Sequence, residues 1–92
     1  MNLLNGRYRR SGRYESGVFE EDLLVMHKET MDTMVLNPPA AAIWEALKWP
    51  QSVSDLTELL SEAFPEENEE ALRSHVKEVL EALLSQEFLL KV

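Results

Sequence analysis

The chain has 92 residues, of which 45% are apolar, and it carries a formal net charge of −8. That length predicts one small domain with a single modest core, which leaves little room for a large substrate cavity. The absence of cysteine excludes disulfides, iron–sulfur clusters and thiolate zinc sites, and it agrees with a reducing cytoplasm. Because no apolar run could serve as a signal peptide or span a bilayer, we expect a soluble cytoplasmic protein without a membrane segment.

Charge is unevenly distributed along the chain. Residues 1–13 hold four arginines and no acid, whereas residues 14–92 hold 17 acids against five lysines and arginines. We expect a flexible basic arm over residues 1–13 and a single folded domain over residues 14–92. An extra strand over residues 7–10, or a docking arm for an acidic partner, remains an alternative. The acidic body should repel a phosphate backbone, which argues against nucleic acid as the main ligand.

Three short strands are predicted in the first half of the folded part. Apolar and β-branched residues predominate in residues 18–20, 23–27 and 33–36, and polar turn segments separate these ranges. These lengths are typical of a small antiparallel meander. Because such a sheet is unstable when both faces are exposed, helices must cover one face.

Three helices are predicted to follow the strands. Asn37 is a candidate N-cap with Pro38 at the first helical position, and this helix runs to about Lys48. A capping box formed by Ser52 and Asp55 starts the second helix. The third is capped by Asn68, and its apolar stripe follows a helical repeat through Leu72, Val76, Val79, Leu80 and Leu83. The predicted fold is α+β, a winged helix-turn-helix-like arrangement of a three-stranded antiparallel sheet followed by three helices. The tail after residue 87 could return as a strand or pack on the helices.

The residues that carry catalysis in other proteins are sparse here. The two histidines, His27 and His75, fall in different predicted elements, and neither has a partner at metal-ligand spacing. No glycine-rich phosphate-binding motif and no nucleophile–histidine–acid arrangement is present. We therefore expect a protein that is not an enzyme and that has no cofactor or metal.

The stretch "LLVMHKETMDTMVLNPPAAAIWEALKWPQSVSDLTELLSEAF" resembles the PqqD-like family, whose domain is also called the RiPP recognition element. The resemblance spans about residues 18–90. It is carried by an apolar hairpin, by a small residue before an Ile-Trp pair, and by a last helix that ends in Leu-x-x-x-x-Phe-Leu. The hairpin loop has Met31 and Asp32 where the family usually has a glycine. The resemblance implies binding of the leader segment of a ribosomally made precursor peptide and its presentation to a modifying enzyme.

A sheet edge can bind such a peptide, because unpaired backbone N–H and C=O groups accept an extended chain as an added strand. The resemblance implies that the third strand is that edge and that the last helix forms the opposite wall. On that helix, two cations and two leucines share one flank. The predicted peptide-binding residues are therefore Thr33, Met34, Val35, Leu36, Arg73, Lys77, Leu80 and Leu84. Two alternatives stay open: Arg73 and Lys77 could pair with Glu69 and Glu81, and the leucines could belong to the core.

The function expected from these observations is a non-catalytic adaptor that binds a precursor-peptide leader. Its expected partners are that leader and a modifying enzyme, such as a radical-SAM protein, a cyclase or a leader peptidase. A homodimer is also conceivable, because an exposed strand edge can pair with itself. A winged-helix nucleic-acid binder and a structural accessory subunit of a modifying enzyme are the alternatives.

Overall fold

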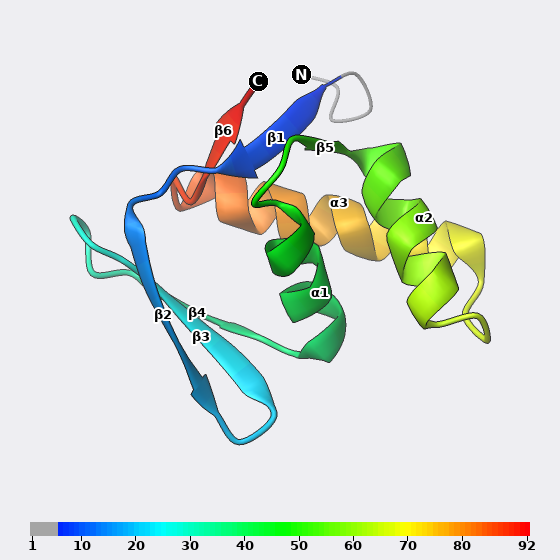
Figure 1. The fold of residues 1–92 in the computed structure, drawn as a ribbon, viewed down its shortest axis with the longest axis horizontal. Coiled ribbons are helices and arrows are strands. Elements are labelled where there is room, and N and C mark those ends of the chain that lie inside the picture. The colour runs from blue at the N-terminus through cyan, green and yellow to red at the C-terminus, as the bar shows by residue number, and fades with distance from the viewer. Residues whose placement is uncertain (1–5) are drawn as a thin grey trace.

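The structure, a computed structural model, describes residues 6–92 as two small antiparallel sheets around three helices (Figure 1). Residues 1–5 of the expected basic arm lie outside the described residues. The first sheet in chain order, β5-β1-β6, consists of β1 (Arg7–Arg10), β5 (Gln51–Ser52) and β6 (Leu89–Lys91). The second sheet, β2-β3-β4, consists of β2 (Tyr14–Phe19), β3 (Asp22–His27) and β4 (Thr33–Leu36). The helices are α1 (Pro38–Ala46), α2 (Val53–Ala63) and α3 (Glu69–Ser85).

The sheet β2-β3-β4 is the predicted meander. Strand β3 pairs antiparallel with both neighbours, so that Val25 lies opposite Ser16 on one side and Met34 on the other. Strand β4 has the predicted bounds, whereas β2 begins four residues before the predicted strand. The α+β prediction is confirmed. Figure 1 shows the β2–β3 hairpin projecting away from the helices.

The sheet β5-β1-β6 brings together segments that are distant in the chain. Residues 7–10 form its central strand and are not part of a flexible arm, because Tyr8 pairs with both Gln51 and Lys91. The Tyr8 side chain is buried in the core. The alternative expectation, an extra strand over residues 7–10, thus agrees with the structure. The C-terminal tail likewise returns as a strand, β6.

The helix starts follow the predicted caps. The Asn37 Oδ1 accepts a hydrogen bond from the Ala40 N–H at 3.2 Å, and Pro38 occupies the first helical position. The Ser52 Oγ and the Asp55 carboxylate form a reciprocal capping box, with both distances 3.0 Å. Asn68 caps α3 by accepting from two backbone N–H groups. These caps explain why α1 leaves β4 at a sharp corner: Asn37 is the only residue between them.

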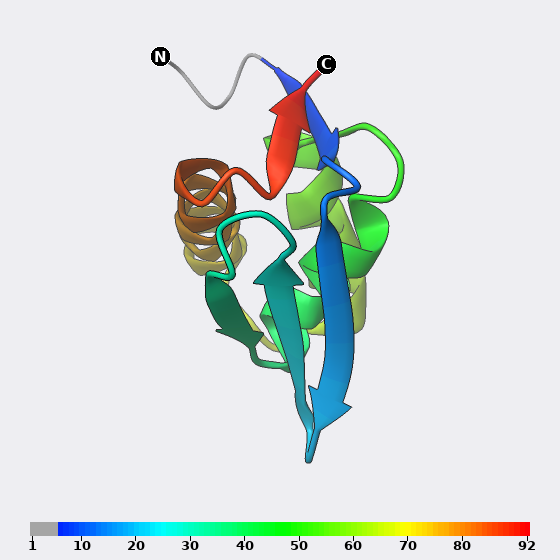
Figure 2. The same ribbon diagram turned by 90° about the vertical axis from the view of Figure 1, so that its left-hand side faces the viewer.

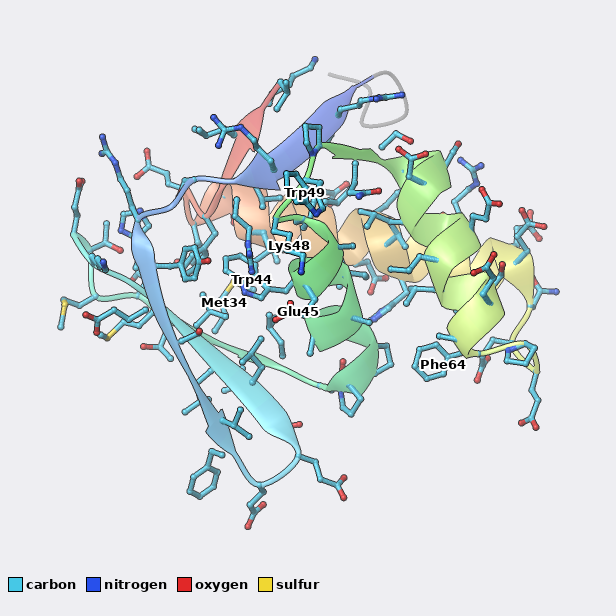
Figure 3. The ribbon with its side chains drawn as sticks, in the orientation of Figure 1. Met34, Trp44, Glu45, Lys48, Trp49 and Phe64 are labelled. Atoms are coloured by element: carbon cyan, nitrogen blue, oxygen red, sulfur yellow. The ribbon has the colours of Figure 1, made fainter. Side chains whose placement is uncertain are left out.

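The core lies between the helices and the inner face of the sheet β2-β3-β4. Trp44 on α1 is its centre, with the Tyr14 ring 4.8 Å and the Phe88 ring 6.0 Å from the indole, both edge-on. Figure 3 shows Trp44 and Met34 lying between α1 and this sheet. Met34 is half-buried and packs against the core. Because Tyr14 lies on β2, Trp44 on α1 and Phe88 in the link between α3 and β6, their packing fixes the position of the sheet relative to α1.

Candidate functional site

Strand β4 is an open edge of its sheet. It pairs with β3 alone among the described strands, and Figure 2 shows it at the side of the sheet nearest to α3. The His27 N–H donates to the Asp32 carbonyl at 2.9 Å, and these two residues lie opposite each other in the extended register of the pair. Because hydrogen-bonded pairs alternate along an antiparallel ladder, Met34 and Leu36 bond to β3. The N–H and C=O groups of Thr33 and Val35 therefore point away from β3, toward the open side.

A groove of about 290 Å³ runs between β4 and α3. Apolar side chains line much of it, from β4, α1 and α3: Met34, Val35, Leu36, Ala40, Val79 and Ala82. The alanines leave room for a bulky ligand side chain. The volume lies at the lower limit of small-molecule pockets. A groove of this size is suited to one or two anchoring side chains of an extended chain, laid beside an unpaired backbone.

The groove also has a polar part with one sign of charge. Its polar lining residues are Asp22, Asn37, His75 and Glu78. Asp22 and Glu78 are acids on opposite walls, and no lysine or arginine lines the groove. The arrangement favours a cationic group on whatever occupies it.

His75 has an unsatisfied polar atom at this site. Its Nε2 is buried and has no hydrogen-bond partner among the described residues. The residue itself is half-buried and lines the groove and also a smaller cavity beside Phe64. A buried polar atom without a partner costs free energy, so this histidine is a strained point beside the groove.

The structure brings together only part of the predicted site. Thr33 to Leu36 form the open edge. On α3, Leu80 is fully buried in the core, and Arg73 and Lys77 are absent from the groove lining. At about 100° per residue, these two cations lie roughly 120–180° around the helix from His75, Val79 and Ala82. Neither cation forms an ion pair with Glu69 or Glu81 within the described residues.

Leu84 lies at a different cavity, of about 430 Å³, near the C-terminal end of α3. The loop after β3 forms part of this cavity, and the buried His27 holds that loop by accepting hydrogen bonds at Nδ1 from the Glu29 and Thr30 N–H groups. An Arg13–Glu29 ion pair at 2.8 Å also lies there. Both of its side chains are largely exposed, so it contributes little to stability.

Sequence reasoning missed His75, Glu78 and Ala82 as groove residues. The helical repeat correctly gives the core face of α3, but the flanks on either side of that face both mix apolar and charged residues. The choice of the cationic flank rested on its two cations and two leucines and on the family resemblance. The small side chain of Ala82 is the signal in the sequence of α3 that marks the other flank as the one that approaches a strand.

The structure thus defines a class: a small α+β domain with an open-edged three-stranded sheet and a groove between that edge and its last helix. The family model of coenzyme PQQ synthesis protein D (PqqD) matches residues 22–89, and the chain belongs to this family. A solved structure titled "TbiB1 in Complex with the TbiA(beta) Leader Peptide" is similar in fold, with a TM-score of 0.75 and 16% identity over 88% of this chain and 93% of that chain. The comparison with curated proteins gives no match.

Two features are absent from residues 6–92. None of the helices there has the length and apolar character to cross a bilayer. The same residues contain no group of three or more histidine and acidic side chains that could hold a metal ion.

Proposed function

We propose that this chain is a non-catalytic protein that binds the leader segment of a ribosomally made precursor peptide and presents it to a modifying enzyme. The observation that carries the proposal is the unpaired edge of β4 beside a groove. The family membership and the similar fold of TbiB1, which was solved with a leader peptide, support it. The leader adds to β4 as a further strand.

Backbone hydrogen bonds supply the sequence-tolerant part of binding. The outward N–H and C=O groups of Thr33 and Val35 offer four bonds to an extended peptide. Each such bond contributes about 0.5–1.5 kcal/mol net, which alone gives weak affinity. Burial of apolar anchors against Met34, Val79 and Ala82 supplies the remainder.

Selectivity comes from the polar part of the groove. Asp22 and Glu78 favour a lysine or arginine of the leader, and His75 lies beside them in the groove lining. As the sequence predicts, Thr33 to Leu36 form the strand to which the leader is proposed to pair. The proposed opposite wall of the peptide site consists of four α3 residues: His75, Glu78, Val79 and Ala82. Arg73 and Lys77 are left out because they lie on the other flank of α3.

The test is a calorimetric titration with the synthetic leader encoded by a short reading frame next to this gene, combined with NMR mapping on the ¹⁵N-labelled full chain. We expect a dissociation constant near micromolar, which corresponds to about −8 kcal/mol. The amides of Thr33, Val35 and Val79 should shift, whereas those of Arg73 and Lys77 should stay in place. Absence of binding, or shifts confined to residues outside β4 and α3, would overturn the proposal.

A further inference from the structure

The outer face of the sheet β2-β3-β4 carries an unusual amount of apolar side chain. Cross-strand neighbours share a face, so the register places Leu24 beside Val35, and Glu15 beside Met26, on the face turned away from the helices. Phe19 lies on this same face, paired with Asp22. Phe19 is 65% exposed and Val35 is 62% exposed. Among the half-buried residues of this sheet, Tyr14, Leu23 and Met34 pack against the core, but Leu24 and Met26 do not.

An antiparallel sheet with one solvated face normally shows polar residues there. Here Phe19, Leu24, Met26 and Val35 form a contiguous apolar surface, which we call the outer patch. Contiguous exposed apolar surface of this kind marks an interaction site more often than chance. The outer patch has no described element over it (Figures 1 and 2).

Gly17 leaves part of the backbone on this face without a side chain. It lies in the middle of β2, opposite Leu24, and a Cβ built there meets nothing within 4 Å. Its φ is not in the left-handed region, so any side chain would fit within this chain. Glycine inside a strand nevertheless costs about 0.5–1 kcal/mol relative to alanine. Close approach of a partner to the backbone is one use of such a glycine, and a side chain added here tests it.

The charges around the outer patch decide between classes of partner. Residues 14–36 contain six acids and one lysine. Glu15 and Asp22 lie on the outer face itself, and Glu20 and Glu21 lie at the hairpin turn. An anionic lipid surface or a nucleic acid would be repelled. A second copy placed face to face would oppose acid to acid, which is unfavourable.

We propose that the outer patch docks a different protein, one whose contact surface is apolar and framed by lysine and arginine side chains. The inference depends on the proposed function only for the identity of that protein, which would be the peptide-modifying enzyme. Val35 belongs both to the outer patch and to the groove lining. A protein seated on the patch would therefore lie directly beside the bound peptide.

The experiment uses the photo-crosslinking residue p-benzoylphenylalanine in the full chain, expressed in the organism that encodes it. Phe19 is the test position. Trp49 is the matched control, because it is also aromatic and is 66% exposed, but lies beyond the end of α1 (Figure 3). The protein crosslinked at Phe19 is identified by mass spectrometry, purified, and titrated against the unmodified chain, Gly17→Thr and Glu15→Lys.

We expect a crosslink at Phe19 that is absent at Trp49. Gly17→Thr should weaken partner binding at least tenfold while the melting temperature rises or stays the same, because threonine favours strands. Glu15→Lys should weaken binding several-fold, and added salt should weaken binding to the unmodified chain. Leader binding by Gly17→Thr should be unchanged, so failure of the docking surface is distinguishable from failure of the peptide site. Equal crosslinking at both positions, a crosslink to a second copy, or full partner affinity of Gly17→Thr would overturn the inference.

Discussion

Replacing Val35 with proline tests the strand-addition mode directly. The Val35 N–H points to the open side of β4, so a proline there removes no hydrogen bond of the β3–β4 ladder. Proline is tolerated at such edge positions. The Val35 side chain is 62% exposed, so little packing is lost either. We therefore expect the free energy of unfolding to change by no more than about 1 kcal/mol.

Peptide binding should respond much more strongly to the same change. The lost N–H removes one backbone hydrogen bond to the leader, and the proline ring occupies the space of the peptide strand, so the adjacent bond is weakened too. Two bonds at about 0.5–1.5 kcal/mol each amount to about 1–3 kcal/mol. This corresponds to a loss of affinity of about 5- to 150-fold at 1.4 kcal/mol per factor of ten.

The assay is a calorimetric titration of the leader, with thermal unfolding followed by circular dichroism. Val35→Thr is the matched control, because it keeps the N–H and the branched shape, and it should bind within about twofold of the unmodified chain. If Val35→Pro proves unfolded, Thr33→Pro makes the same test at the first residue of the strand. A folded proline variant that binds as tightly as Val35→Thr would refute the reasoning that the leader pairs with β4.

Three further predictions concern the groove wall, the core and a helix cap. Glu78→Lys should weaken binding of a leader with a basic residue several-fold at low salt, and the effect should shrink as salt rises. Lys77→Glu, one residue away on the other flank of α3, should not weaken binding. Titrations over a series of salt concentrations that show the reverse order would place the peptide on the cationic flank. Trp44→Ala should destabilise the domain by about 3–5 kcal/mol in urea unfolding, because it empties the centre of the core, and a loss below about 1 kcal/mol would contradict the packing described. The hydrogen bond from the Ser52 N–H holds the pKa of the Asp55 carboxyl in the folded protein below its usual value. The ionised Asp55 therefore stabilises the fold fully above the pKa that this carboxyl has in the unfolded chain, and this stabilisation is lost as pH falls through the pKa in the folded protein. Unfolding measured below about pH 4 should therefore show a smaller pH dependence in Asp55→Asn than in the unmodified chain, and identical pH profiles would exclude this contribution.

The elements with local signals could be predicted from the sequence. Asn37 with Pro38, the Ser52–Asp55 box and Asn68 are short-range features, and each helix begins where they indicate. Strand β4 has the expected bounds for the same reason: a polar loop precedes it and a helix cap follows it.

Strands that pair with residues far away in the chain could not be predicted from the sequence. Strand β1 has a buried Tyr8, but no local pattern shows that residues 7–10 pair with Gln51 and with the C-terminal strand, Leu89–Lys91. The candidate site shows the same limit. The sequence identifies the edge strand, whereas the flank of α3 that faces it is set by how α3 packs against α1 and α2, which no local pattern in the sequence shows.

The position of β1 has a practical consequence for choosing the shortest piece of this chain that folds. The segment matched by the family model begins at residue 22, after both β1 and β2. A truncation to that segment would remove the middle strand of one sheet and an outer strand of the other. It would leave β6 and β5 without a strand to join them and open a hole where Tyr8 is buried. Expression of an isolated domain should therefore begin no later than Gly6, and a shorter piece is expected to aggregate through its newly exposed strand edges.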